Sequence, residues 1–198
     1  FMLIYVFMFG YVFKSKQQYF AIFVFIGITF WDFFNKCLIQ SVKLIKANKP
    51  IVSKVYIPKF ILILVKIGVN GFKMFISLLI IVAMLAVWRV PITYNVIYII
   101  PILMTLIVLV FGFSCYLLHY GVFVEDLSNV LNIALRFLFY LTGIFWSIMD
   151  RLPAPYNSYI GRCNPIAFLL TSARDCVIYG STPHRKLLLL WFVIGLII

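Results

Sequence analysis

Long apolar stretches constrain this chain more than any other feature of its sequence. Three of them run from Tyr19 to Gln40, from Phe60 to Trp88 and from Tyr94 to His119. A helix that crosses a bilayer needs about 20 mainly apolar residues, and each stretch is at least that long. The 198 residues are 65% hydrophobic and 11% charged, whereas a soluble domain has about 25% charged residues. The sequence therefore predicts an all-α, polytopic membrane protein.

Three shorter apolar runs add to these stretches, so the sequence predicts six spans. All six belong to one predicted transmembrane domain, residues 1–198. The expected spans cover residues 1–13, 19–40, 60–88, 94–119, 130–149 and 187–198. The first and the last are too short to cross a bilayer, so we expect both to be incomplete. No internal repeat is evident. The sequence thus predicts one helical domain that crosses the membrane several times.

The segment 41–59, between the second and third predicted spans, is the most basic part of the chain. It carries Lys43, Lys46, Lys49, Lys54 and Lys59 and no acid. Short cytoplasmic loops are rich in lysine and arginine, so we place this segment inside the cell and, by alternation, the segment 150–180 outside. The outer segment also holds several arginines, so the excess of basic residues on the inner side is small and supports this orientation only weakly. The predicted location is the cytoplasmic (inner) membrane.

The net charge of +12 bears on the partners of the chain. Its basic residues lie among apolar runs, and no zinc knuckle, basic helix or other nucleic-acid motif accompanies them. We therefore expect anionic lipid headgroups and lipid-linked phosphates as partners, and no nucleic acid.

The segment 150–180 interrupts the apolar pattern and predicts a short re-entrant helical hairpin on the outer side, between spans five and six. LPAP and Asn164-Pro165 both break helices. Two short helices fit this pattern, over residues 156–163 and 165–178. The second would have Asn164 as its cap and Pro165 at its first position, where the missing N–H costs nothing. An ordinary external loop is the alternative, although its apolar side chains would then face water.

Three polar residues in the third predicted span are candidates for a substrate path. Lys66, Asn70 and Lys73 follow one another at i, i+4 and i+7, which places them on one helix face. Charges inside a membrane are costly and mark functional sites by default, and a diphosphate-linked lipid would need such a face. The alternative is that this half of the span lies in the interface, where its lysines reach the headgroups.

Aromatic residues near the end of the fifth predicted span are further candidates for the same path. They are Phe139, Tyr140, Phe145 and Trp146. Aromatic faces stack on sugar rings, but anchoring in the lipid interface and plain packing are alternative uses of these side chains. The sequence alone leaves both uses open.

Catalytic and metal sites are not indicated. His119 and His184 lie far apart without neighbouring carboxylates, and the five acidic residues are scattered. No phosphate-binding loop of the form G-x-x-x-x-G-K-[ST] occurs, so ATP, if it is used, binds to another chain. The cysteines form no C-x-x-C pair. Cys163 and Cys176 form either a disulfide in an oxidising compartment or two free thiols.

Several motifs together resemble those of type 2 ABC exporter permeases. The stretch GIFWSIMDRLPAPYNSYIGRCNPIAFLLTSARDCVIYG, residues 143–180, resembles their C-terminal signature: an aromatic helix end, P-x-x-Y, N-P and a short helix that contains arginine. NKPIVSKVYIP, residues 48–58, resembles their first cytoplasmic loop, and GITFWDFF, residues 27–34, their second span. The segment 120–129 resembles their loop before the fifth span, except that Glu125-Asp126 replaces the usual Arg-Asp.

This resemblance covers nearly the whole chain and is greatest to the permeases that export O-antigen or teichoic acid. It implies that the chain moves lipid-linked polysaccharide, such as the glycan of lipopolysaccharide in the cell envelope, as a homodimer with two separate ATPase subunits. ATP and Mg would bind to those subunits. No cofactor and no enzymatic step is therefore expected on this chain.

The resemblance also implies roles for particular residues. Coupling to the ATPase is expected at Asn48, Pro50, Lys54, Tyr56 and Pro58, although a loop held on the lipid surface is the alternative. An external gate is expected at Asp150, Arg151, Pro153, Pro155, Tyr156, Asn164, Pro165 and Arg174. The charged gate residues either pair with their sequence neighbours, as Arg174 with Asp175, or face an anionic cargo.

Other functions are alternatives at this point. A member of the same family could export a drug, a lipid or another small cargo. A membrane enzyme acting on lipid-linked sugars would need a cluster of carboxylates or histidines at one interface. A membrane scaffold would transport nothing.

Overall fold

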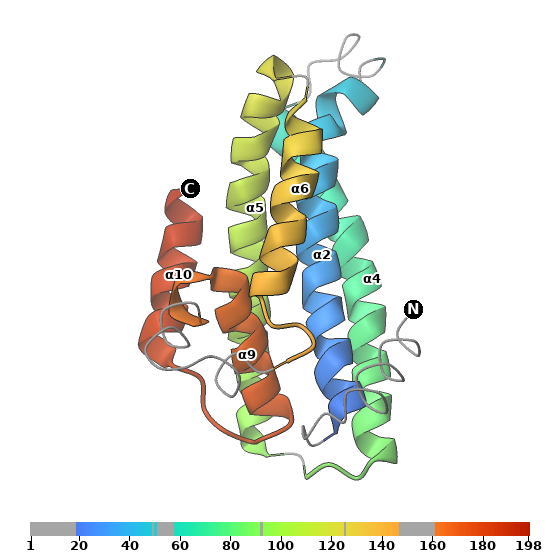
Figure 1. The fold of residues 1–198 in the computed structure, drawn as a ribbon, viewed down its shortest axis with the longest axis vertical. Helices are drawn as coiled ribbons and strands as arrows, with labels where there is room; N and C mark the ends of the chain where they lie inside the picture. The colour runs from blue at the N-terminus through green and yellow to red at the C-terminus, as the bar shows by residue number, and fades with distance from the viewer. Residues whose placement is uncertain (1–18, 49, 51–57, 92, 125, 147–160) are drawn as a thin grey trace.

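The computed structural model describes residues 19–48, 50, 58–91, 93–124, 126–146 and 161–198. Every regular element in this part of the chain is a helix, which confirms the all-α prediction (Figure 1). The helices are α2 (Phe20–Ala47), α4 (Lys59–Val87), the short 3₁₀ helix η2 (Tyr94–Tyr98), α5 (Ile99–Phe123), α6 (Leu127–Leu141), α9 (Pro165–Val177) and α10 (Arg185–Ile197).

Within the described residues, three segments are long and apolar enough to cross a membrane: Phe20–Ile45, Lys59–Val87 and Tyr94–Phe123. They correspond to three of the predicted spans. The 15 residues of α6 extend about 22 Å at 1.5 Å per residue, less than the roughly 30 Å of a bilayer core. The 13 residues of α10 are shorter still, and the expected span over residues 1–13 lies outside the described residues. The topology of six spans therefore stays a prediction.

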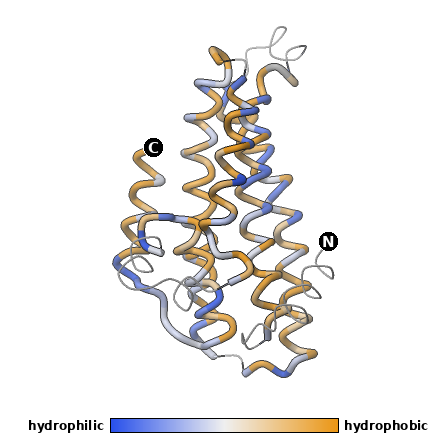
Figure 2. Tube along the Cα trace, viewed as in Figure 1, coloured by the Kyte–Doolittle hydropathy of each residue, from blue (hydrophilic) through white to orange (hydrophobic). Residues whose placement is uncertain are grey.

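Helix α2 lies at the centre of the bundle. It packs against α4, α5, α6 and α9, and Figure 1 shows it between α6 and α4. In its most apolar window 67% of the residues are buried, against 22% in that of α4. Many exposed side chains of α4 are large and apolar, as Phe72 and Phe75 illustrate, and Figure 2 shows hydrophobic colours along much of this helix. Helix α4 thus presents to its surroundings the kind of surface that lipid chains contact.

Helix α2 continues to Ala47, beyond its expected end at Gln40. The physical reason is close packing on α5. Val42 is buried, and a Cβ atom on Gly121 of α5 would lie 2.7 Å from the Val42 carbonyl oxygen. Part of the expected cytoplasmic loop 41–59 is therefore helix, and its residues 51–57 lie outside the described part of the chain.

Helix α6 ends at Leu141, before the expected end of the fifth span at residue 149. The N–H of Thr142 still bonds to the Leu138 carbonyl at 2.9 Å, and the Thr142 hydroxyl donates to the same oxygen at 2.6 Å. Gly143 then has φ 66°, a left-handed conformation that glycine adopts without strain and that ends many helices. The chain consequently turns within the bundle after α6.

Helix α9 begins as the sequence predicts. The Oδ1 atom of Asn164 accepts hydrogen bonds from the N–H groups of Ile166 at 3.1 Å and Ala167 at 3.3 Å, and Pro165 is the first helical residue. The helix predicted over 165–178 and its cap are confirmed. Of the helix predicted over 156–163, only residues 161–163 are described, and these are helical. Figure 1 shows α9 beside the lower parts of α2 and α5, and it contacts both.

Candidate functional site

Arg174 of α9 joins three parts of the bundle at one buried point. The residue is 3% exposed. Its Nε donates to the Phe23 carbonyl of α2 at 3.1 Å, Nη1 to the Gly143 carbonyl at 2.9 Å and Nη2 to the Ile144 carbonyl at 2.6 Å. The guanidinium also lies 3.5 Å from the centroid of the Phe23 ring. We call Arg174, Phe23, Gly143 and Ile144 the outer clamp.

The outer clamp exists because α6 ends inside the bundle. Carbonyl groups beyond a helix end lack intrahelical donors, and when they are buried, as those of Gly143 and Ile144 are, they need partners within the protein. Arg174 supplies those donors, and its positive charge suits the negative end of the α6 dipole. Gly27 of α2 leaves the space, since a Cβ atom there would lie 2.5 Å from Nη2 of Arg174. The clamp therefore fixes α9 to both α2 and the end of α6.

The surroundings of Arg174 differ from both arrangements that the sequence suggested. In the described part of the chain Asp32 and Lys36 form an ion pair, whereas Arg174 and Asp175 do not. The guanidinium is buried in the bundle rather than directed toward a passing cargo. Burial lowers the pKa of Arg174 and raises the pKa of Asp175 from their ordinary values. Carbonyl oxygens and an aromatic ring contact the guanidinium, and among the described residues no carboxylate lies within ion-pair distance of it.

Of the remaining gate candidates, the structure describes Asn164 and Pro165. The Nδ2 group of Asn164 donates to the hydroxyl of Thr142 at 3.3 Å, a second link between the start of α9 and the end of α6. Pro165 begins α9. The other five lie outside the described residues: Asp150, Arg151, Pro153, Pro155 and Tyr156.

A groove of about 530 Å³ runs between α2 and α6. It is lined by Trp31, Asn35 and Ile39 of α2 and by Asn132, Leu135, Arg136, Phe139 and Tyr140 of α6. Phe139 is the centre of an aromatic cluster: its ring centroid lies 5.5 Å from that of Trp31 and 5.6 Å from those of Tyr140 and Phe145. We call this region the aromatic groove.

The chemistry of the aromatic groove suits a sugar. The apolar faces of pyranose rings stack on aromatic side chains, and amide and guanidinium groups bond to hydroxyls. Of the predicted path residues, Phe139 and Tyr140 line the groove, Phe145 contacts Phe139, and Trp146 is half-buried in the turn after α6. The sequence reasoning missed six groove residues: Trp31, Asn35, Ile39, Asn132, Leu135 and Arg136. Helical spacing from Phe139 could have shown those on α6, but those on α2 depend on how the helices pack.

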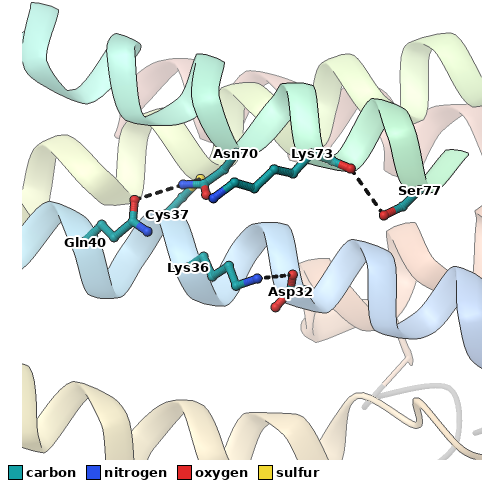
Figure 3. Close-up of polar contacts among 7 residues, drawn as sticks. All are labelled: Asp32, Lys36, Cys37, Gln40, Asn70, Lys73 and Ser77. Carbon is teal, nitrogen blue, oxygen red and sulfur yellow. Dashed lines mark hydrogen bonds and ion pairs between the residues drawn. The ribbon is translucent and has the colours of Figure 1, made fainter. Parts of the chain in front are cut away.

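The predicted path residues on α4 lie elsewhere. Asn70 is 3% exposed, and its Nδ2 donates to Oε1 of Gln40 on α2 at 3.0 Å (Figure 3). Lys73 lines a small cavity between α2 and α4, whereas Lys66 is half-buried and not among the cavity residues. The structure therefore does not bring the polar face of α4 together with the aromatic groove, since the two line different hollows beside α2.

The described coupling candidates lie at two helix ends. Asn48 follows α2, and its N–H and Nδ2 both donate to the Leu44 carbonyl, at 3.1 and 2.8 Å. Pro58 precedes α4, and its carbonyl accepts from the N–H of Ile61 at 3.0 Å. Pro50 is described, but Lys54 and Tyr56 are not. The helix ends on either side of the expected coupling segment are thus fixed by local hydrogen bonds.

Cys163 and Cys176, which the sequence left as either a disulfide or two free thiols, are free thiols. Cys176 is fully buried in α9 and Cys163 is exposed before it, and neither is in a disulfide.

The sequence of this chain is similar to those of two known transport proteins. No family model matches the sequence. An O-antigen export system permease protein RfbA of Klebsiella pneumoniae is 25% identical over 193 residues, which is 97% of this chain and 74% of that protein. A second protein of the same name and organism is 24% identical over 192 residues, 96% of this chain and 73% of the relative. The resemblance to O-antigen exporter permeases is confirmed, as is the multi-pass location in the inner membrane.

Proposed function

We propose that this chain is the transmembrane subunit of an ATP-driven ABC exporter that moves lipid-linked polysaccharide outward across the cytoplasmic membrane. The observation that carries the proposal is the similarity to two O-antigen export system permeases over 97% and 96% of this chain. Similarity over this length takes in nearly all of the predicted spans and of the segments 41–59 and 150–180, as expected when whole domains correspond.

The aromatic groove supports a glycan as the cargo. Its aromatic cluster offers stacking surfaces, and Asn35, Asn132 and Arg136 offer hydrogen-bonding groups beside them. Stacking on aromatic faces depends little on the exact sugar, so a long glycan could move along such a surface in steps. A path for an apolar drug would not need three amide or guanidinium groups in one groove.

ATP hydrolysis belongs, in this proposal, to a separate ATPase subunit that binds Mg and ATP, and this chain performs no chemistry. The segment around Asn48, Pro50, Lys54, Tyr56 and Pro58 would receive the movement of that subunit. A short element between fixed helix ends can pass on a rigid-body shift. Two copies of the chain would enclose the path, and the re-entrant segment 150–180 would close it on the outer side.

Deletion of the gene tests the cargo. We expect surface polysaccharide to disappear while lipid-linked glycan accumulates inside the cell, measured by gel analysis of envelope glycans. Restoration by the wild-type chain is the control. Unchanged surface glycan in the deletion strain would reject the polysaccharide and leave a drug, a lipid or another small compound as the cargo.

Purification of the tagged chain tests the transport mechanism. We expect an ATPase subunit to copurify in mild detergent and the complex to hydrolyse ATP. A chain that purifies alone and modifies lipid-linked sugars in the absence of ATP would instead be an enzyme. A chain that does neither would be a scaffold, and the proposal would be wrong.

A further inference from the structure

A small polar cavity lies between the middle parts of α2 and α4. Asp32 and Lys36 of α2 form an ion pair, with Oδ2 and Nζ 2.6 Å apart, and their side chains are 51% and 46% exposed. Asn70 and Lys73 of α4 line the same cavity, as does Ser77, whose hydroxyl donates to the Lys73 carbonyl at 3.2 Å. Figure 3 shows these side chains together along the two helices. We call this region the α2–α4 pocket.

The position of the α2–α4 pocket, near the middle of two helices long enough to cross a membrane, is unusual for charged groups. Lys73 is the middle residue of α4, and Asp32 and Lys36 lie in the middle third of α2. A helix centred in a bilayer core of about 30 Å places its middle residue roughly 15 Å from either edge, too far for a lysine side chain to reach the headgroups. Charged groups at this depth face water or a polar partner rather than lipid chains.

Two polar groups of the pocket, the Lys73 ammonium and the Asn70 Oδ1 atom, lack an ion-pair or hydrogen-bond partner among the described residues. Lys36 is neutralised by Asp32, but no described acid lies within ion-pair distance of Lys73. The Nδ2 group of Asn70 is occupied by Gln40 and by the Cys37 sulfur at 3.5 Å. Its Oδ1 is buried and has no hydrogen-bond partner among these residues. The pocket therefore offers one cation and one acceptor, at a place where both should be satisfied.

The size of the cavity limits what enters it. Its volume is about 30 Å³, enough for one or two oxygen-sized groups. Because Asp32, Lys36 and Lys73 are exposed, the rest of a ligand would lie on the open face. A phosphoryl oxygen bonded to Lys73, with a neighbouring hydroxyl that donates to Asn70 Oδ1, satisfies both unused groups.

We propose that the α2–α4 pocket binds the phosphorylated end of the cargo, a sugar joined through phosphate to a lipid. This inference rests on the proposed function and adds to it a second site, separate from the aromatic groove on the other face of α2. The phosphate would be held here while the glycan extends along the groove. The same face of a second copy is a poorer occupant, because each face carries two lysines against one acid and two such faces repel.

Thiol labelling tests the proposal. Ser77→Cys is introduced into the full chain with Cys115→Ser and Cys163→Ser, and the protein is placed in lipid nanodiscs. We expect a water-soluble, membrane-impermeant methanethiosulfonate to label the new thiol. A sugar-bearing polyprenyl diphosphate, added at about ten times its half-protecting concentration, should slow labelling about tenfold, because it occupies most of the sites. The same polyprenol without phosphate should not, and inorganic diphosphate shows whether free phosphate suffices.

Matched variants identify the group that binds. Lys73→Gln should abolish the protection, and Lys73→Arg should keep it because the charge remains. Lys66→Gln is the control on the same helix and should leave the protection unchanged. Equal melting temperatures of the three variants show that the fold is intact. Should Lys73→Gln not fold, Lys73→Met takes its place, since it removes the same charge from an exposed side chain of similar length.

Other results would overturn the site. An unreactive thiol would mean that the face contacts lipid, and a disulfide between two Ser77→Cys chains on mild oxidation would mean that a second copy covers it. Labelling that no phosphorylated probe slows would leave only water in the pocket. If gene deletion abolishes surface glycan while these probes give no protection, the pocket is rejected and the exporter stands; unchanged surface glycan rejects the exporter itself.

Discussion

At the scale of single residues, Arg174 links α9 to α2 and to the end of α6. It is a buried cation whose three bonds go to backbone carbonyls of two different segments. Two of these carbonyls follow the end of α6, and the third belongs to a turn of α2 where Gly27 lacks a side chain. Removing the guanidinium would leave the buried Gly143 and Ile144 carbonyls without this donor, each at a cost of about 1–3 kcal/mol.

We expect Arg174→Gln to lower the free energy of unfolding by about 2–4 kcal/mol, because relief from burying a charge offsets only part of the lost bonding. The measurement is the thermal unfolding of the purified chain in detergent. Arg162→Gln, at an exposed position before α9, is the control and should leave the unfolding temperature unchanged. Equal unfolding temperatures for both variants would show that the outer clamp contributes nothing to stability.

Gly27→Ala tests the same contact from the α2 side. A Cβ atom at this position would lie 2.5 Å from Nη2 of Arg174 and 3.1 Å from the Ile144 side chain, so we expect destabilisation of about 1–3 kcal/mol, as for other overpacked sites. Gly68→Ala of α4 is the matched control, since nothing lies within 4 Å of its Cβ position. It should stabilise the helix by up to about 1 kcal/mol. Opposite signs in thermal unfolding are the expected result.

At the scale of elements, the end of α6 and the start of α9 depend on one another. Thr142 ends α6, and Asn164 begins α9 and bonds to the Thr142 hydroxyl. The turn between α6 and the undescribed residues is held further by Arg174. A helix of 13 residues is marginal in isolation, so α9 owes its stability to its cap and to its buried face.

We expect Asn164→Ala to destabilise α9 by about 1 kcal/mol, the usual cost of losing an N-cap. Hydrogen exchange of the amides of Ile166 and Ala167 should rise first, because their N–H groups lose the Oδ1 acceptor. Asn164→Ser restores an acceptor and should recover most of the protection. Unchanged exchange in the alanine variant would contradict the role of this cap.

At the scale of the whole molecule, α2 separates two different surfaces. The aromatic groove lies between α2 and α6, and the α2–α4 pocket lies between α2 and α4. Large apolar side chains on the remaining surface of α4 suit lipid. In the proposed function, α2 would contact the glycan through the aromatic groove and the phosphate through the α2–α4 pocket.

We expect Tyr140→Ala to slow glycan export by about two- to tenfold, since one aromatic contact contributes about 0.5–1.5 kcal/mol. Tyr140 is 73% exposed, so the substitution should leave the unfolding temperature unchanged. Tyr94→Ala, 99% exposed and outside the groove, is the control for removal of a surface tyrosine. The measurement is the rate at which surface glycan appears after induction. Equal rates for the two variants would show that the groove does not contact the cargo.

The sequence by itself determined the helical class, three long spans and the start of α9. These features depend on local properties: the length of an apolar run, the helix-breaking effect of proline, and the capping chemistry of Asn164. It also predicted Phe139 and Tyr140 as part of a path, because their aromatic character can be read without a fold.

Only the tertiary structure decided where those elements meet. The sequence could not show that Arg174 bonds to Phe23, Gly143 and Ile144 rather than to Asp175, because the free carbonyls appear only when α6 ends beside α2 and α9. Nor could it show that Trp31 joins Phe139 while Asn70 joins Gln40, on different sides of α2. Helical spacing fixes the angle between side chains within one helix, but contacts between helices depend on how their surfaces pack.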